Sequence, residues 1–319
     1  MRRSTGVRAY NLYSPEERMD LAINNVHLDL GAGLRGTDMG PSAIHVAGLV
    51  EAIARLGHQV AEISGLTVDP REAKEPGDPA LRYLNVIEPL CATLADRVCE
   101  DLDAGLTPLV LGGDHSLAMG SIAGVARHHR ARGERVGVIW VDAHTDMNVP
   151  ETSPSGNIHG MPLAVLLGHG PPSLLAIGGD APSLHVEDVA IIGVRDVDRS
   201  ETSLVHTSGV RVYPMSEIDR RGIGAVIDEA IELVSRHTTG IHLSFDLDGV
   251  DPRDAPGVGT PVHGGLSFRE SHFICEAVAA TQRLTSMDMV ELNPTRDHQN
   301  KTAELAVWLI QSALGKTIL

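Results

Sequence analysis

The stretch Val136-Gly-Val-Ile-Trp-Val-Asp-Ala-His-Thr-Asp146 joins an apolar run to a group of polar side chains. The part from Val136 to Val141 has the composition of a β-strand that is buried on both faces. Further expected strands span residues 21–30, 109–111, 189–194 and 241–247. We therefore expect a sheet whose inner strands have neither face in water.

Segments with a helical hydrophobic period lie between and after these runs. They span residues 42–56, 118–129, 223–237, 268–281 and 302–314. Ser42, which follows Pro41, is the expected N-cap of the first helix. The alternation of strands and helices predicts an α/β fold, a three-layer α/β/α sandwich with a mostly parallel central sheet. Because no repeat or linker interrupts the pattern, we expect an N-terminal tail at residues 1–20 and a single domain at residues 21–319.

The composition excludes several classes of partner. Lys and Arg number 26 and Asp and Glu number 42 among 319 residues, which gives a formal net charge of −16. Nucleic-acid binding needs clustered Lys and Arg, so this charge argues against a nucleic-acid partner. Aromatic residues make up only 3% of the chain, too few to indicate a platform for stacked bases. Hydrophobic residues make up 42%, enough for a large and mainly aliphatic core.

The three cysteines, Cys91, Cys99 and Cys275, are too few and too widely spaced to indicate a disulfide framework. We therefore expect a reducing compartment, the cytoplasm. No apolar run approaches a length of about 18 residues, which a membrane span needs. Residues 1–20 lack the apolar stretch of a secretory signal. The sequence thus predicts no membrane partner.

Two glycine-containing segments are similar to nucleotide-binding motifs. Gly31-Ala-Gly-Leu-Arg-Gly36 fits the dinucleotide pattern GxGxxG, but the expected helix begins only at Ser42 and Glu51 comes too early for the acidic residue of that motif. Gly315-Lys-Thr317 lacks the first glycine of a phosphate-binding loop, because Ile310 occupies that position. An NAD-dependent enzyme therefore remains only an alternative, which a cofactor titration would test.

Three polar segments lie at the carboxyl ends of expected strands. They are Gly112-Gly-Asp-His-Ser116, Asp142-Ala-His-Thr-Asp146 and Ser244-Phe-Asp-Leu-Asp248. In extended backbone, residues two apart point to the same side, so the acidic and histidine side chains of each segment can converge. Parallel α/β sheets bind ligands beyond the carboxyl ends of their strands. Several buried charges at that edge are costly unless a cation compensates them, so the pattern predicts a metal site.

Six side chains are candidate metal ligands: His115, Asp142, His144, Asp146, Asp246 and Asp248. Four carboxylates and two imidazoles are too many for one small ion, but they match two divalent cations in number and charge. Oxygen-rich ligation with some imidazole suits Mn²⁺. Two such ions, about 3.5–4 Å apart, would hold a bridging water and lower its pKa toward neutrality. His242 shares the face of Asp246 but lies about 13 Å deeper at about 3.3 Å per residue, so we expect a satisfied histidine in the core or behind the ligands.

The metal segments and several others resemble the ureohydrolase family, and its arginase-like members in particular. The further matching segments are Asp29-Leu-Gly-Ala-Gly33, Gly36-Thr-Asp-Met-Gly-Pro-Ser-Ala43, Ser155-Gly-Asn-Ile-His-Gly160, Val194-Arg-Asp-Val-Asp198, Gly259-Thr-Pro-Val262 and Glu291-Leu-Asn-Pro294. The resemblance therefore covers nearly the whole chain after the tail. The segments around Ser155 and Asp198 are the ones that separate arginase-like members from agmatinase-like members.

The resemblance implies a catalytic arginase-like domain with two Mn²⁺ ions per subunit. The implied reaction converts L-arginine and water to L-ornithine and urea through a metal-bridging hydroxide. By position, one ion takes His115, Asp142, Asp146 and Asp246, and the other takes Asp142, His144, Asp246 and Asp248. Family members form trimers or hexamers, so the resemblance also implies a homo-oligomer.

The resemblance further assigns residues to the substrate. Glu291 matches the carboxylate that holds the guanidinium, and His159 matches a proton-shuttling histidine. Asp146 is expected to pass the proton of the hydroxide to the leaving amine. Asn148, Ser153 and Ser155 correspond to residues around the α-carboxylate, and Asp198 and Glu201 to residues near the α-amino group.

Two alternatives remain within this picture. The first alternative to an arginase-type enzyme is an agmatinase or another ureohydrolase that acts on a guanidino substrate. A panel of substrates would distinguish these enzymes. A catalytically silent homologue that senses arginine is the second alternative. Such proteins usually lose metal ligands, whereas every ligand implied here is present.

Overall fold

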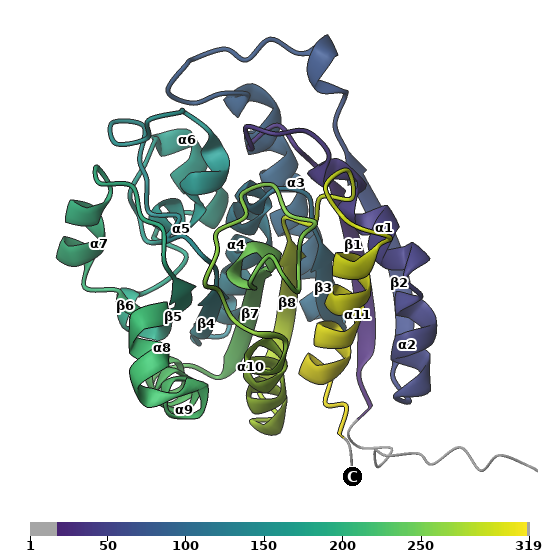
Figure 1. Ribbon diagram of the computed structural model, residues 1–319. Coiled ribbons are helices and arrows are strands. Elements are labelled where there is room, and N and C mark those ends of the chain that lie inside the picture. The colour runs from purple at the N-terminus through teal and green to yellow at the C-terminus, as the bar shows by residue number, and fades with distance from the viewer. Residues whose placement is uncertain (1–17, 318–319) are drawn as a thin grey trace, which may run out of the picture.

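Eight strands form one sheet in the computed structural model, which describes residues 18–317 (Figure 1). Their order is β2-β1-β3-β8-β7-β4-β5-β6, and every neighbouring pair is parallel. The strands are β1 (Asp20–His27), β2 (Gln59–Thr67), β3 (Thr107–Leu111), β4 (Val136–Val141), β5 (Val189–Val194), β6 (Arg211–Pro214), β7 (Gly240–Asp246) and β8 (Leu284–Val290). The predicted α/β fold with a parallel central sheet is confirmed.

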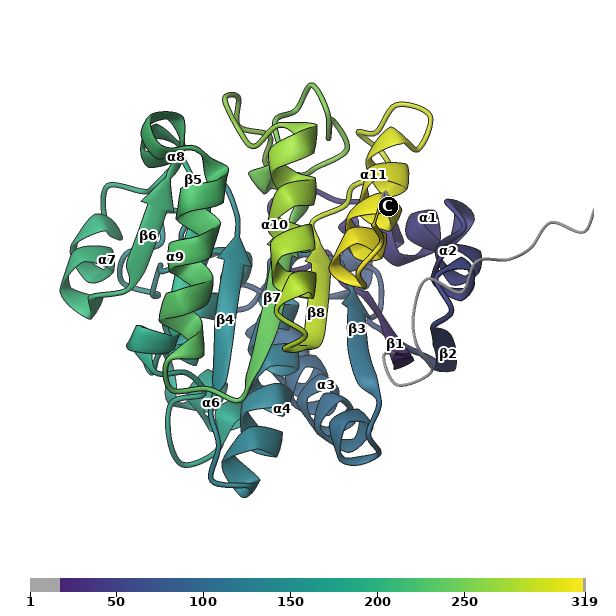
Figure 2. The same cartoon turned by 90° about the horizontal axis from the view of Figure 1, so that it is seen from below.

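Helices cover both faces of this sheet, as the three-layer prediction requires. Helices α3 and α4 pack together on one face, and α9, α10 and α11 lie on the other (Figure 2). The α-helices are α1 (Gly40–Val46), α2 (Leu49–Arg55), α3 (Leu84–Asp103), α4 (Ala118–Ala131), α5 (Pro162–Leu166), α6 (Pro172–Leu175), α7 (Thr202–Ser208), α8 (Met215–Arg221), α9 (Ile223–Ser235), α10 (Phe268–Ala280) and α11 (Lys301–Ala313). Short 3-10 helices are η2 (Thr37–Met39), η3 (Arg71–Ala73), η4 (His115–Leu117), η5 (Ile158–Gly160), η6 (Ala176–Gly178), η7 (Val186–Asp188) and η8 (Leu247–Gly249).

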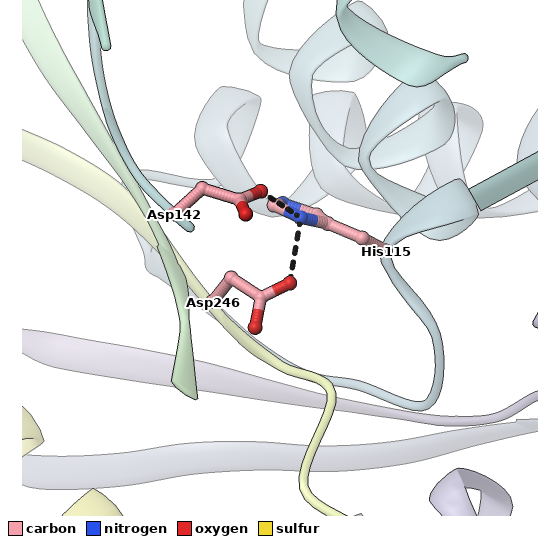
Figure 3. Close-up of side chains that lie close together, drawn as sticks. All are labelled: His115, Asp142 and Asp246. Atoms are coloured by element: carbon pink, nitrogen blue, oxygen red, sulfur yellow. Dashed lines mark ion pairs between the residues drawn. The ribbon is translucent and has the colours of Figure 1, made fainter. Parts of the chain in front are cut away.

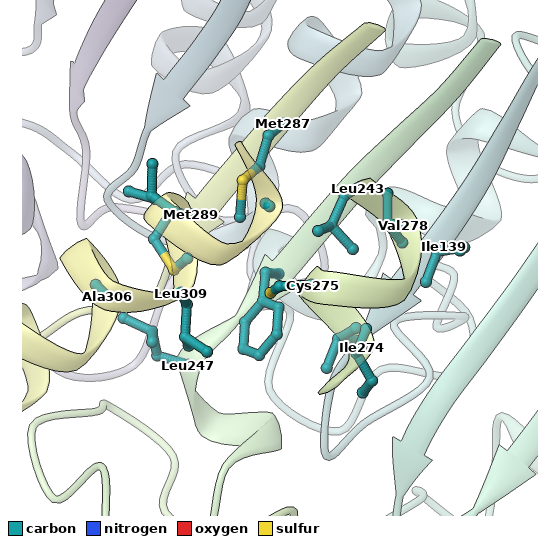
Figure 4. Close-up of a cluster of buried hydrophobic side chains, with 14 of the residues drawn as sticks. Ile139, Leu243, Leu247, Ile274, Cys275, Val278, Met287, Met289, Ala306 and Leu309 are labelled. Atoms are coloured by element: carbon teal, nitrogen blue, oxygen red, sulfur yellow. The ribbon is translucent and has the colours of Figure 1, made fainter. Parts of the chain in front are cut away.

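The core consists of two apolar clusters, one against each face of the sheet. Successive strand residues alternate between them, so Leu109 and Leu111 belong to one cluster and Val110 to the other. Figure 4 shows how Leu243 and Met287 of the sheet lie against α10 and α11. Because both faces are covered, all residues of β4, β5 and β7 are buried, as their composition predicted.

The first predicted helix differs from the structure. Residues 42–56 form two helices, because Gly48 adopts a left-handed conformation with a φ of 87° between α1 and α2. The prediction of Ser42 as an N-cap was wrong, since α1 begins at Gly40 and Pro41 lies in its first turn. Proline fits that turn because its missing N–H would have no partner inside the helix. The first strand ends at His27 rather than Leu30.

The predicted elements do not include α3, the short helices α5 to α8, or the strands β2, β6 and β8. The predicted tail falls mainly on residues 1–17, which lie outside the described residues, and β1 already begins at Asp20. The single domain at residues 21–319 stays a prediction. Within residues 18–317, none of the helices is both long enough and apolar enough to cross a membrane.

The topology brings the predicted metal segments together. Strands β3, β8, β7 and β4 are consecutive neighbours in the sheet, and their carboxyl ends meet at one edge. A close approach of backbone fixes the turn after β3: a Cβ at Gly113 would overlap the backbone oxygen of Leu28, so only glycine fits without movement. The Gly31–Gly36 segment forms bends, and the next α-helix begins only at Gly40, so this segment is not a dinucleotide-binding turn.

Candidate metal centre and active site

The six predicted metal ligands converge at the carboxyl edge of the sheet. Their donor atoms form two groups, His115 with Asp142 and Asp246, and Asp142 with His144 and Asp248. Within each group all donor atoms lie within 4.8 Å of one another, and Asp142 belongs to both. Figure 3 shows His115, Asp142 and Asp246 pointing toward a common centre. Asp146 joins the first group, because its Oδ2 lies 3.3 Å from Nδ1 of His115.

The histidine nitrogens mark where a cation fits. Nδ1 of His115 lies 3.2 Å from Oδ2 of Asp142 and 3.2 Å from Oδ2 of Asp246. This nitrogen is buried and has no hydrogen-bond partner among the described residues, although carboxylates surround it. In the second group, Nδ1 of His144 lies 3.3 Å from Oδ1 of Asp142 and 3.1 Å from Oδ2 of Asp248. Carboxylate oxygens and imidazole nitrogens aimed at two shared points fit a pair of divalent cations.

The electrostatics of the cluster also favour bound cations. Burial, together with neighbouring carboxylates such as Asp142, raises the pKa of Asp146 and of Asp246 well above the ordinary value. Burial alone would lower the pKa of His115, but the Asp142 and Asp146 carboxylates raise it to about 9. Without cations the cluster must therefore gain protons, whereas two divalent ions would compensate the four carboxylates directly.

Further side chains orient the ligands. The indole Nε1 of Trp140 donates to Oδ2 of Asp142 at 2.9 Å, and its ring stacks on His115 with centroids 4.1 Å apart. Nε2 of His115 lies 2.9 Å from Oγ of Ser244. Trp140 and Ser244 precede ligands by two positions on β4 and β7 and therefore share their face. That spacing was the signal in the sequence that could have identified both residues.

Two site residues adopt a left-handed backbone that is uncommon outside glycine. Asp146 has a φ of 49° and Glu291 has a φ of 63°. Hydrogen bonds to the surrounding backbone hold both in place: the backbone oxygen of Asp146 accepts from Leu163 and Ala164, and the N–H of Glu291 donates to Gly113. Strain maintained in this way is typical of functional sites, where it aims a side chain that a relaxed backbone would direct elsewhere.

Glu291 forms a buried pair with His159 beside the metal ligands. Its Oε1 lies 2.9 Å from Nδ1 of His159 and accepts the backbone N–H of His115 at 2.9 Å. Burial alone would raise the pKa of Glu291, but the neighbouring His159 outweighs it and holds that pKa below the ordinary value. Burial alone would lower the pKa of His159, but the neighbouring Glu291 carboxylate outweighs burial and raises that pKa. The other oxygen, Oε2 of Glu291, is buried without a hydrogen-bond partner among the described residues and can accept from a cationic ligand.

One cavity of about 270 Å³ brings four of the predicted metal ligands, His144, Asp146, Asp246 and Asp248, together with the predicted substrate residues. Its lining contains five of the predicted residues, namely Asn148, Ser153, Ser155, Asp198 and Glu201, together with His159. Nδ2 of Asn148 donates to Oδ2 of Asp198 at 3.0 Å, which joins two of the substrate segments. The cavity thus offers neutral donors and carboxylates at one part of its wall and the metal groups at another.

Sequence reasoning missed some residues of this wall. Asn157, Asp196 and Thr260 also line the cavity. All three lie inside segments that carry the family resemblance, so their positions were available although no role was assigned to them. The hydroxyl of Thr260 donates to Oδ2 of Asp248 at 2.7 Å, which links the loop after η8 to a metal ligand.

Residues 19–315 match the arginase family. The chain belongs to the arginase family. It is 48% identical to the arginase of Bacillus caldovelox over 300 residues, which is 94% of this chain and 99% of that relative. It is 47% identical to the arginase of Bacillus subtilis (strain 168) over 299 residues, 94% of this chain and 99% of that relative. The family resemblance inferred from the motifs is confirmed, and as an arginase-family protein the chain is a hydrolase.

Solved arginase structures share the fold. The native arginase of Bacillus caldovelox superimposes with a TM-score of 0.90 at 47% identity and covers 94% of this chain and 100% of its own. The Entamoeba histolytica arginase, solved in complex with L-ornithine, gives a TM-score of 0.85 at 32% identity, covering 94% and 99% of the two chains. The arrangement of β3, β4, β7 and β8 around the site is therefore the arginase arrangement.

Proposed function

We propose that this arginase-family hydrolase converts L-arginine and water to L-ornithine and urea, with two Mn²⁺ ions per subunit as cofactor. The observation that carries the proposal is the single cavity that joins two carboxylate–imidazole groups to a set of residues suited to an amino acid. The family membership and the ornithine complex of the Entamoeba relative support the same substrate.

The six ligands would hold the two ions, with Asp142 shared between the two groups described above and Asp246 also shared as the family resemblance implies. When bound, the ions supply a water molecule that is activated as a nucleophile near neutral pH. The donor set of oxygen and imidazole supports manganese over metals that prefer thiolates. The variant His115→Asn would remove an imidazole from the group with Asp142 and Asp246. The variant His144→Asn would remove an imidazole from the group with Asp142 and Asp248.

Glu291 is proposed to hold the substrate guanidinium. Its charged carboxylate is buried, and its Oε2 has a free acceptor site for an N–H of the substrate. A planar guanidinium matches a carboxylate because its N–H groups are fixed in one plane. Glu291 thereby places the guanidinium carbon between itself and the metal ligands.

Proton transfer is assigned to Asp146 and His159. Asp146 is a carboxylate that lines the cavity, and its Oδ2 lies 3.3 Å from Nδ1 of His115. It is therefore suited to take a proton released from the attacking water and to deliver it to the leaving amine of ornithine. His159 lines the same cavity and is suited to exchange protons with solvent, because imidazole titrates near neutral pH.

The other part of the wall is proposed to recognise the amino-acid end of the substrate. Asn148, Ser153 and Ser155 offer neutral donors for the α-carboxylate, while Asp198 and Glu201 offer acceptors for the α-ammonium. Agmatine lacks the carboxylate and would leave those donors unpaired. A site built around such a group can reject the analogue by a factor of about 10⁴.

A urea-release assay with and without added Mn²⁺ tests this function. We expect rapid release from L-arginine and far slower release from agmatine and 4-guanidinobutyrate. Equal or reversed rates would reject the arginine assignment and leave the metal site intact. Binding of L-arginine without urea release after manganese loading would instead identify a silent homologue.

We also propose that residues 21–319 form one catalytic domain, that the protein assembles as a homo-oligomer, a trimer or hexamer, and that it acts in the cytoplasm. The family resemblance supports the assembly, and the three free cysteines, Cys91, Cys99 and Cys275, support a reducing compartment. The acidic composition supports small-molecule rather than nucleic-acid partners. Analytical ultracentrifugation would distinguish a trimer or hexamer from a monomer.

A further inference from the structure

Arg195 lies at the end of β5 and donates hydrogen bonds to backbone oxygens of three separate segments. Nη1 donates to Gly193 at 3.1 Å and to Gly249 at 3.0 Å. Nη2 donates to Asp248 at 2.6 Å, to Val250 at 3.3 Å and to Val262 at 2.7 Å. Nε donates to Val262 at 3.1 Å. Every nitrogen of the guanidinium is therefore engaged, and consecutive carbonyls of residues 248–250 are bound by one side chain.

These partners are carbonyls, and none of the ion pairs among residues 18–317 involves Arg195. An arginine whose guanidinium is half-buried without a carboxylate partner needs a structural reason. The carbonyl array provides one, because five N–H donors in a fixed plane can hold several loops in one geometry. Burial lowers the pKa of Arg195, and the carboxylates of Asp248 and Asp142, both predicted metal ligands, partly offset that effect.

The bound segments surround only one of the two metal groups. Asp248 is a ligand of the group that also contains Asp142 and His144. The backbone N–H of Arg195 donates to the oxygen of Ala143 at 2.8 Å, and the N–H of Ala143 donates to Oδ1 of Asp248 at 3.2 Å. Arg195 therefore contacts the backbone on both sides of this group. Within residues 18–317, Arg195 forms no hydrogen bond or ion pair with His115 or Asp146 of the other group.

The same residue leads into the substrate wall. Thr260, which donates to Asp248 and lines the cavity, is two residues before Val262 on the loop that Arg195 holds. Asp198 and Glu201 follow Arg195 on the same segment of chain. Between them and Arg195, the N–H of Asp196 donates to the oxygen of Ala143 at 3.0 Å. The side chain of Arg195 thus connects its own segment, which leads to Asp198 and Glu201, with the segment that carries the predicted metal ligand Asp248.

The surrounding chain leaves space for this guanidinium. A Cβ at Gly265 would lie 2.5 Å from Nη2 and 2.7 Å from Cζ of Arg195, and 2.8 Å from the backbone nitrogen of Asp251, so a larger residue there would displace the guanidinium and also press on the backbone at Asp251. A lysine at position 195 would retain the positive charge but offer one nitrogen in place of three. It could not satisfy the same set of carbonyls.

We propose that Arg195 is a positioning residue that fixes Asp248 and the Thr260 loop, and thereby sets the affinity of one metal position and the placement of Asp198 and Glu201. This inference rests on the proposed function. It predicts that the two metal positions differ in their dependence on Arg195, because only the position formed by Asp142, His144 and Asp248 is held by this residue.

Manganese titration of the metal-free full-length protein tests the proposal without substrate. For Arg195→Lys we expect one Mn²⁺ to bind with wild-type affinity and the other to bind about 10- to 100-fold more weakly, the range typical of residues that support metal ligands. The exchange-coupled EPR signal of a manganese pair should fall in parallel. His144→Asn and His115→Asn serve as references, and Arg195→Lys should behave like His144→Asn.

Arg283→Lys is the matched control. Arg283 is also half-buried and donates to backbone oxygens, those of Ser235 and Thr238, but it lies at the opposite end of the sheet. The Arg283→Lys variant should bind both ions with wild-type affinity. Kinetically, Arg195→Lys should raise KM for L-arginine at saturating Mn²⁺ through Asp198 and Glu201, an effect that Arg283→Lys should lack.

Two results would overturn the proposal: wild-type affinity at both positions in Arg195→Lys, or equal weakening of both positions. If Arg195→Lys does not fold, Gly265→Ala displaces the guanidinium from outside and should weaken the same single position, and intact binding there would overturn the proposal too. Because metal binding is measured without substrate, a wild-type protein that binds two ions yet releases no urea would reject the proposed function and not the role of Arg195.

Discussion

Replacement of Trp140 by phenylalanine isolates one hydrogen bond at the shared metal ligand. The indole N–H donates to Asp142 at 2.9 Å, and both side chains are fully buried. Phenylalanine retains an aromatic ring over His115 but has no donor. Since a hydrogen bond to a buried charged group contributes about 1.5–3 kcal/mol, and about 1.4 kcal/mol corresponds to a tenfold change in affinity, Mn²⁺ binding should weaken about 10- to 150-fold.

The expected pattern is weakening at both metal positions, because Asp142 belongs to both groups. Isothermal titration of the metal-free protein with Mn²⁺ measures it. Tyr213→Phe is the matched control: its hydroxyl also donates to a carboxylate, Glu229, at 3.1 Å, but on β6 and away from the cavity. Wild-type affinity in Trp140→Phe, or an equal loss in Tyr213→Phe, would refute the reasoning.

Three further changes have defined outcomes. His115→Asn should lower the manganese content to about one ion per subunit and the rate of urea release by about 100-fold or more, measured by elemental analysis and a urea assay. Burial alone would raise the pKa of Asp251, but N–H donors of Arg253 and Gly264 help to hold it well below the ordinary value, so Asp251→Asn should cost about 2 kcal/mol in urea unfolding at pH 7. Because the folded-state pKa is the lower one, that difference should be full above about pH 4 and shrink as the pH falls toward the folded-state pKa. Gly113→Ala should destabilise the fold by about 3 kcal/mol in the same assay, since its Cβ would overlap the backbone of Leu28.

Each of these changes has a control or a refuting result. Full urea release with one ion bound in His115→Asn would contradict a role for both ions. A stability loss in Asp251→Asn that stays constant from pH 7 to pH 3 would contradict its pKa assignment, and Arg253→Ala should cost less than about 1 kcal/mol because Arg253 is 83% exposed. Gly65→Ala, where no atom lies within 4 Å of the new Cβ, should leave stability nearly unchanged, and an equal loss there would contradict the steric argument for Gly113.

The sequence predicted the centre of the sheet because burial on both faces leaves a simple signature. Strands β4 and β5 are continuous apolar runs, and β7 is fully buried although it also carries His242 and Ser244. In a parallel sheet their ends meet at one edge, so the polar residues that follow could be assigned to one site before any coordinates. The convergence of the six candidate ligands was predictable for this reason. His242 is a fully buried histidine bonded to Ser286, as its depth below Asp246 suggested.

The missed elements depend on partners that are distant in sequence. Strand β8 contains the buried Asp288, whose Oδ2 accepts a hydrogen bond from Ser121 on α4 and lies 3.2 Å from Nε2 of His242 on β7. The edge strand β2 exposes residues such as Ile63 and has no buried run. Pro89 lies inside α3, and a proline within a segment predicts the end of a helix, so the local sequence does not indicate this helix.

Supporting residues were harder to predict than ligands for the same physical reason. The role of Arg195 depends on carbonyl oxygens of residues 248–250 and 262, and backbone atoms leave no trace in the sequence. A ligand is identified by its own side-chain chemistry, whereas a positioning residue is identified by what it touches. Such residues became visible only when the loops were placed in space.

Anomalous diffraction at the manganese absorption edge, from crystals grown with excess Mn²⁺, tests the central claim most directly. The account predicts two peaks per subunit, one among His115, Asp142, Asp146 and Asp246 and the other among Asp142, His144, Asp246 and Asp248. A single peak, or none between these six side chains, would contradict it.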